Sequence, residues 1–132
     1  MPATTAPEGT KQLRVLIVDD DPSMLILLPK VLRRKGFDVA AAEDADIAEL
    51  VLEKTQFDAV ILDVQMPGRD GFSLVGAIRQ RWPEVKIIFV SAYDSDSMRK
   101  RAALMGVEVF LAKPVGVEEL ILHLRKPKAE NG

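Results

Sequence analysis

Five short apolar runs alternate along this chain with five segments whose apolar residues recur at helical spacing. The three most continuous runs fall within residues 15–18, 59–62 and 87–90, and polar or turn residues follow each of them. A run of this length with such boundaries is typical of a strand that is buried on both faces. Strands that alternate with helices predict a parallel sheet with helices packed on both of its faces.

We expect the strands to cover residues 13–18, 37–41, 59–63, 86–91 and 107–112. The second and fifth carry Asp38 and Glu108, so they should lie outside, whereas the three most apolar strands should be central. This distribution fits the strand order 2-1-3-4-5, a flavodoxin-like, doubly wound α/β sheet of five parallel strands with five helices. A chain of 132 residues supports one such domain, expected at 12–126, with a flexible lead-in at 1–11 and a flexible tail at 127–132.

The first helix should open near Pro22, because proline is tolerated early in a helix. Its apolar side would consist of Met24, Leu27, Leu28, Val31 and Leu32. Pro29 lies inside this helix, and we expect it to bend the helix or to leave one carbonyl without its usual partner.

The other helices are placed by capping residues and helical spacing. Asp94 or Ser95 can cap the fourth helix, the third should run from about 72 to 82, and the last should cover about 117–126. Asp44 can cap the second helix, whose apolar positions are Ile47, Leu50 and Val51.

The composition excludes several classes of protein. Cysteine is absent, which excludes disulfides and thiolate sites, and His123 has no second histidine with which to form a metal cluster. A net charge of −2 gives no basis for electrostatic binding to nucleic acid. No apolar stretch approaches the ~20 residues that span a bilayer, and residues 1–12 contain no secretory signal. We therefore expect a cytoplasmic protein that binds neither nucleic acid directly nor a membrane.

Polar side chains gather where the expected strands end. Open α/β sheets bind their ligands at the carboxyl ends of the strands, so these groups should share one crevice. In chain order they are Asp19, Asp20 and Asp21 after the first strand, Asp63 at the end of the third, Ser91 at the end of the fourth, and Lys113 after the fifth.

The chemistry of this set favours phosphoryl transfer. Ionised carboxylates share a small space only if something neutralises them. Oxygen ligands favour a hard cation such as Mg²⁺, which binds one or two protein carboxylates and completes its shell with water and phosphate oxygens. Asp63 would then use one oxygen on the metal and the other as a nucleophile. Mg²⁺, Lys113 and the Ser91 hydroxyl can meet the charge of the transferred group.

The sequences LIVDDDPSM, VILDVQMPGRDG, IIFVSAYDS and FLAKPV resemble the four signature regions of response-regulator receiver domains from two-component signalling. Each motif alone is weak, but the four occur in the right order and each lies at the end of an expected strand. The resemblance covers roughly residues 13–125.

The resemblance implies a role for each acidic residue. Asp63 is expected to be the phosphoacceptor. Asp20 resembles a direct Mg²⁺ ligand, and Asp19 resembles the acid that acts mainly through water. The backbone carbonyl of Gln65 is similar to the main-chain metal ligand of the family. Asp21 has no strong role in the family and is expected to be an exposed loop acid.

Three further roles follow from the same resemblance. Ser91 resembles the switch hydroxyl, and Lys113 the lysine that pairs with the phosphoryl group. A cis peptide bond is implied between Lys113 and Pro114. Phe110 stands where the family often carries a switch tyrosine or phenylalanine, although an ordinary packing role stays open. The basic run 99–101 is either the solvated face of the fourth helix or part of a docking surface.

The implied function is that of a phosphorylation-controlled module. A sensor histidine kinase or a histidine phosphotransfer protein would donate to Asp63, and the surface of helix four, strand five and helix five would then change to control an output domain or partner protein. A phosphorylation-dependent homodimer is compatible with this function. The chain would phosphorylate and dephosphorylate itself without being a turnover enzyme. Whether it stands alone or is excised from a longer protein stays open.

Two other functions are compatible with the fold. One is a phosphorylation-independent interaction adaptor with a vestigial pocket, which equal partner binding with and without beryllofluoride would favour. The other is a small flavodoxin-like enzyme or nucleotide-binding protein, which is disfavoured because the chain lacks a glycine-rich phosphate loop.

Overall fold

The structure, a computed structural model, describes residues 12–66 and 68–126. Five parallel strands form one sheet in the order β2-β1-β3-β4-β5, which confirms the expected topology. The expected lead-in at 1–11 and tail at 127–132 lie outside the described residues. The strands are β1 (Arg14–Val18), β2 (Asp38–Ala42), β3 (Ala59–Asp63), β4 (Lys86–Ser91) and β5 (Val109–Ala112).

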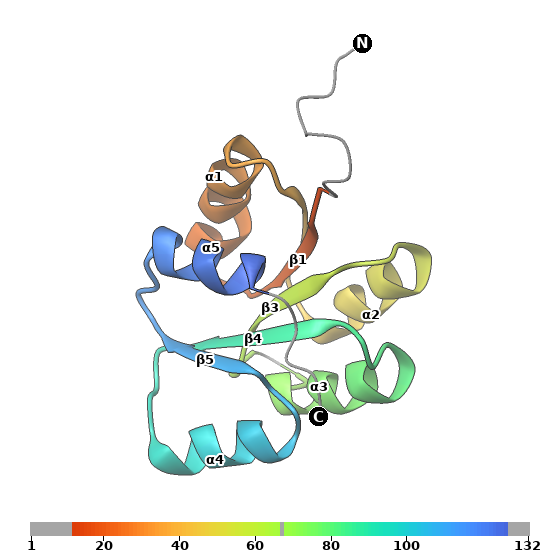
Figure 1. Ribbon diagram of the computed structural model, residues 1–132. Helices are drawn as coiled ribbons and strands as arrows, with labels where there is room; N and C mark the ends of the chain where they lie inside the picture. Colours follow the sequence, from red (N-terminus) through yellow and green to blue (C-terminus); the bar gives the residue numbers. More distant parts are fainter. Residues whose placement is uncertain (1–11, 67, 127–132) are drawn as a thin grey trace.

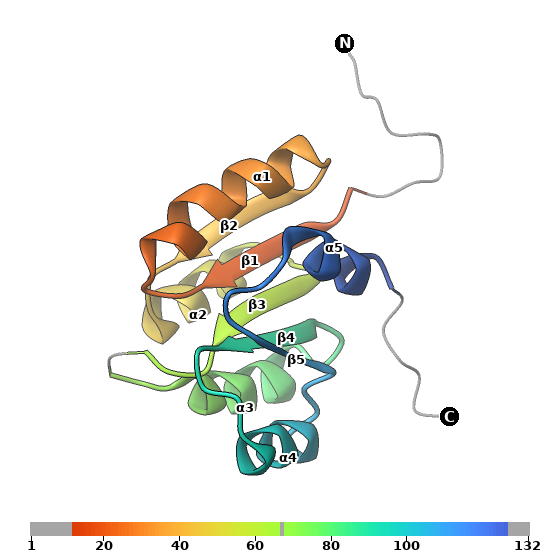
Figure 2. The ribbon, with the colours of Figure 1, turned by 90° about the vertical axis from the view of Figure 1, so that its left-hand side faces the viewer.

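Helices cover both faces of the sheet (Figures 1 and 2). The segments α1 and α5 pack on one face, and α2, α3 and α4 pack on the other, which confirms the doubly wound fold. Among the described residues, no helix is both long and apolar enough to cross a bilayer. The helices are α1 (Leu28–Arg34), which follows a π-helical turn η1 (Ser23–Leu27), then α2 (Ala45–Lys54), α3 (Gly71–Arg81), α4 (Asp96–Leu104) and α5 (Val117–Arg125).

The sheet is central to two apolar layers because side chains alternate between its faces. In β1, Leu16 and Val18 face α2–α4, whereas Val15 and Ile17 face α1 and α5. All residues of β3 and β4 are buried, as expected for central strands. The residues of β5 are less buried, as expected for an edge strand.

The first helix differs from the regular helix that the sequence predicts. It begins with η1, where the N–H of Leu28 donates to the carbonyl of Ser23. Pro29 follows directly and has no N–H with which to close an ordinary turn, so the wider turn lies where the irregularity was expected. The prediction that Leu27 faces inward is wrong: its side chain is 58% exposed, because the wide turn shifts residues around the helix axis.

Two other expectations need correction. Leu50 is 56% exposed, because α2 packs through the small residues Ala45 and Ala48 together with Leu52. The fifth strand begins at Val109 rather than at residue 107, because the N–H of Val107 donates to the carbonyl of Ala102 and closes the end of α4.

Candidate functional site

The strand register brings the expected site residues to one edge of the sheet. Val18 of β1 pairs with Leu62 of β3, so the next residues, Asp19 and Asp63, end neighbouring strands. Asp63 in turn pairs with Val90 of β4. Ser91 ends β4 beside Ala112, and its carbonyl accepts from the N–H of Lys113 at 2.7 Å.

Three carboxylates meet at this edge. Asp19, Asp20 and Asp63 each offer an oxygen, and these oxygens all lie within 4.8 Å of one another. Asp19 is fully buried and Asp63 is 7% exposed, whereas Asp20 is exposed to solvent. The cluster therefore has two buried acids and one acid at its mouth.

Lys113 lies among these acids. Its Nζ is 2.8 Å from Asp19 Oδ2 and 3.3 Å from Asp63 Oδ2. Burial acts to lower the pKa of Lys113, but its contacts with Asp19 and Asp63 outweigh burial and raise the pKa above its usual value. Lys113 is therefore protonated at neutral pH. The peptide bond between Lys113 and Pro114 is cis, as the resemblance implies.

Asp63 is costly to ionise in this setting. Its pKa is raised from 3.8 to about 6, mainly by burial and in addition by the nearby charge of Asp19. The N–H of Gln65, which donates to Asp63 Oδ1 at 3.2 Å, and the ammonium of Lys113 both act in the opposite direction. At neutral pH most Asp63 side chains are ionised, although their environment opposes it.

The donor set fits a hard cation. One ammonium cannot neutralise three clustered carboxylates. Asp19 Oδ2 is buried and, apart from its ion pair with Lys113, accepts no hydrogen bond. An all-oxygen set with an open side toward solvent at Asp20 suits Mg²⁺ better than zinc.

Of the two expected switch residues, Ser91 lies at the same edge, whereas Phe110 lies within β5, where it pairs with Phe89. Ser91 is fully buried, and its Oγ accepts from the N–H of Tyr93 at 3.0 Å. Phe110 is partly buried, packs edge-on against Phe89 with ring centroids 6.1 Å apart, and has the guanidinium of Arg99 4.8 Å from its ring centre. Phe110 therefore takes part in core packing.

Asp21 lies in the loop after β1 with its side chain 42% exposed, as expected, but it also makes contacts that the sequence did not predict. Its Oδ1 accepts from both the N–H and the hydroxyl of Ser23, at 3.0 Å each, and these bonds lower its pKa. Its Oδ2 lies 3.9 Å from Lys113 Nζ. The spacing Asp21-Pro22-Ser23 is typical of an aspartate that caps a turn, and this signal was present in the sequence.

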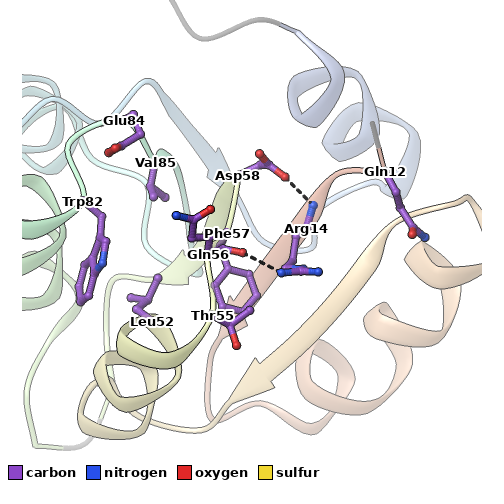
Figure 3. Close-up of a pocket in the computed structure, with 10 residues that line it drawn as sticks. All are labelled: Gln12, Arg14, Leu52, Thr55, Gln56, Phe57, Asp58, Trp82, Glu84 and Val85. Carbon is purple, nitrogen blue, oxygen red and sulfur yellow. Dashed lines mark hydrogen bonds between the residues drawn. The ribbon is translucent and has the colours of Figure 1, made fainter. Parts of the chain in front are cut away.

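Figure 3 shows a separate hollow of about 340 Å³ at the amino ends of the strands. Arg14 lies at this hollow, where its N–H donates to Asp58 at 2.8 Å and its Nε donates to Asp38 at 2.9 Å. Leu52, Phe57, Trp82 and Val85 supply apolar lining. The hollow lies at the opposite end of the sheet from the carboxylates, so it is not the site described above.

Comparison with known proteins supports one family. The family described as "Response regulator receiver domain" matches residues 15–125. The "Transcriptional regulatory protein PrrA" of Mycobacterium leprae is 36% identical over 117 residues, which are 89% of this chain and 50% of that protein. The "Heme response regulator HssR" of Staphylococcus aureus is 31% identical over 113 residues, 86% of this chain and 50% of that protein. The chain thus spans about half the length of these relatives.

Solved structures agree with the fold. Chemotaxis protein CheY4 of Vibrio cholerae has a TM-score of 0.82 and 29% identity, over 87% of this chain and 98% of that one. A response regulator protein of Burkholderia pseudomallei, solved with a phosphorylated aspartic acid, calcium ion and citrate, has a TM-score of 0.81 and 25% identity, over 87% of this chain and 68% of that one.

Proposed function

The chain belongs to the family of response regulator receiver domains, and from this membership we propose that Asp63 accepts a phosphoryl group from a phosphohistidine. The donor would be a sensor histidine kinase or a histidine phosphotransfer protein, and the receiver domain would comprise residues 12–126. The observation that carries the proposal is the meeting of three carboxylates and Lys113 at one edge of the sheet. The phosphorylated aspartic acid of the Burkholderia pseudomallei protein supports it.

The residues divide the chemistry among them. Asp20, Asp63 and the backbone carbonyl of Gln65 would hold Mg²⁺, and Asp19 would act through water. The cation would neutralise the acids and the oxygens of the incoming phosphoryl group. One oxygen of Asp63 attacks phosphorus, the bond from phosphorus to the donor imidazole breaks, and Lys113 Nζ pairs with a phosphoryl oxygen. Water later hydrolyses the aspartyl phosphate, so the phosphoryl group is lost without a separate enzyme.

Phosphorylation would be transmitted through Ser91. A phosphoryl group on Asp63 offers new acceptor oxygens to the Ser91 hydroxyl, which lies at the end of the neighbouring strand. Movement of Ser91 would shift the adjoining loop and leave room for Phe110 to turn inward. The surface of α4, β5 and α5 would then change and alter the affinity for an output domain or partner protein.

One experiment tests both acceptance and switching. Acetyl phosphate added to the wild-type chain with Mg²⁺ should shift the amide NMR signals around Asp63, Ser91 and the strand 109–112. Without Mg²⁺ the spectrum should stay unchanged, because the clustered acids would repel the phosphoryl donor. Shifts confined to the pocket would contradict the switch, and full shifts without any divalent cation would contradict the metal role. An adaptor that works without phosphorylation predicts no shift in either case.

An apolar groove beside the site is our proposed docking place for the donor. The groove measures about 390 Å³, and Asp21 and Lys113 lie at its border with the carboxylates. Its apolar walls come from the first helical segment and from the connection between β5 and α5, which lie on the same face of the sheet in Figure 1. These wall residues are Met24, Leu27, Leu28, Val31, Pro114, Val115 and Val117. A helix that carries the phosphohistidine could bury an apolar side chain here.

Leu27→Glu tests this docking surface. Because Leu27 is 58% exposed, the change should leave the fold intact. Transfer from a histidine kinase that phosphorylates the wild type should slow by about tenfold or more, whereas uptake from acetyl phosphate should be unchanged. Leu50→Glu is the matched control, since Leu50 is 56% exposed on the opposite face. Equal rates of kinase transfer to wild type and Leu27→Glu would rule the groove out.

A further inference from the structure

Arg69 links the turn after β3 to the neighbouring helix α2. Its Nη2 donates to Glu49 Oε1 at 2.7 Å, and its Nη1 donates to Asp46 Oδ1 at 3.1 Å. Its Nε donates to Ser73 Oγ in the first turn of α3 at 3.2 Å. Each of the three guanidinium nitrogens therefore has a separate partner, and the partners belong to two helices.

The turn that carries Arg69 also carries groups of the proposed metal site. Asp63 ends the strand before it, and Gln65 follows two residues later. Gly71, at the far end of the turn, donates its N–H to the carbonyl of Val64 at 2.7 Å. A Cβ on Gly71 would lie 2.5 Å from the carbonyl oxygen of Asp63, so only glycine allows this close approach.

These contacts hold the two ends of the turn together, and Arg69 supplies the hydrogen bonds described between the turn and α2. Asp70 is occupied as the cap of α3, because its Oδ1 accepts from the N–H of Ser73 at 2.9 Å. Gly68 has a φ of +79°, a conformation that glycine adopts readily and that gives the turn little stiffness of its own. Among the hydrogen bonds described for this turn, only those of Arg69 reach α2.

The link to Glu49 is the stronger of the two. Glu49 is 23% exposed and Asp46 is 80% exposed, so solvent screens the second pair more. The hydrogen bond with Glu49 is also the largest cause of the raised pKa of Arg69. A planar guanidinium that bridges two carboxylates and a hydroxyl fixes direction as well as distance.

We propose that Arg69 is a positioning residue that, through Glu49 and Asp46 of α2, holds the turn after β3 in the shape needed for cation binding at Asp63 and Gln65. This inference rests on the proposed function. Mg²⁺ requires near-ideal octahedral geometry, so a main-chain oxygen on a loose turn must be ordered at the moment of binding. A turn that is already held removes this entropic cost and raises the affinity for the cation.

Isothermal titration of the purified chain with MgCl₂ tests the inference. Arg69→Met should weaken Mg²⁺ binding by about fivefold, less than the loss typical for a group that contacts a metal ligand directly. Glu49→Gln should also weaken Mg²⁺ binding, although it leaves the guanidinium of Arg69 in place. Arg69→Lys should recover part of the affinity, since lysine keeps the charge but not the fork of donors. In phosphorylation by acetyl phosphate, the Mg²⁺ concentration at half-maximal rate should rise while the rate at saturating Mg²⁺ stays near wild type.

Arg81→Met is the matched control. Arg81 also joins α3 to α2, with Nη2 3.0 Å from Glu53 and Nη1 3.8 Å from Glu49, but it lies far along α3 from the turn. Its loss should leave Mg²⁺ affinity unchanged. If Arg69→Met and Glu49→Gln bind Mg²⁺ like the wild type, or if Arg81→Met weakens binding equally, the inference is wrong. If the wild type itself binds no Mg²⁺, the proposed function fails instead.

Discussion

Asp63→Asn should abolish phosphoryl uptake from acetyl phosphate in the presence of Mg²⁺. Asparagine keeps the shape of the side chain but has no anionic oxygen to attack phosphorus. Loss of a covalent nucleophile lowers a rate by on the order of 1000-fold or more, so no phosphorylated chain should be detected by intact-protein mass spectrometry. The effect should be the same with a histidine kinase as donor, because both donors would use the same carboxylate.

Asp94→Asn is the control for this experiment. Asp94 is an exposed aspartate in the loop after β4 that pairs with Arg99, and it is not among the three clustered carboxylates. Its loss should leave phosphoryl uptake near the wild-type level. Phosphorylation of the Asp63→Asn chain at wild-type yield would show that another group is the acceptor and would overturn the proposal.

The central features of the fold could be predicted because they depend on burial. Strands β1, β3 and β4 are apolar on both faces, and this alone places them in the middle of the sheet. Once the strand order is known, Asp19 and Asp63 must lie side by side at the carboxyl ends of β1 and β3. The meeting of the acids therefore followed from the sequence without any knowledge of side-chain contacts.

The features that the sequence did not predict depend on contacts between distant segments. Leu50 and Ala48 both fit a helical stripe, and only the packing of α2 on the sheet shows that alanine faces inward. The basic run 99–101 left two alternatives open. In the structure the guanidinium of Arg101 lies 4.0 Å from the ring centre of Phe72, and that of Arg99 lies over Phe110. Two of these three basic residues thus contact aromatic rings, although all three stay exposed to solvent.

The contacts of a buried lysine are another feature that the sequence did not predict. Lys86 is 7% exposed on β4, and its Nζ donates to the backbone carbonyls of His123 and Lys126 at the end of α5. In the sequence, Lys86 only marks the start of an apolar run. Its partners lie almost forty residues away and are main-chain atoms, so no pattern of side chains could have indicated them.

Without divalent cations, the free energy of unfolding should decrease as pH rises from about 4 to about 6. The pKa of Asp63 is raised from 3.8 to about 6 in the folded chain, so the folded state binds more protons than the unfolded state in this range. Stability is therefore lost as the pH passes through the interval. A shift of this size corresponds to a loss on the order of 3 kcal/mol, since one pKa unit is worth 1.36 kcal/mol.

Asp63→Asn should remove this decrease, because asparagine does not ionise. In urea denaturation with a chelator, the variant should match the wild type near pH 4 and exceed it by on the order of 3 kcal/mol at pH 7. Asp94→Asn should behave oppositely, since its contact with Arg99 lowers the pKa of Asp94 and stabilises the folded chain above pH 3.8. Equal stability of wild type and Asp63→Asn at pH 7 would contradict the raised pKa. Added Mg²⁺ should stabilise the wild type more than the variant. The negative charge of Asp63 destabilises the site without a cation, and the proposed cation would bind that same charge.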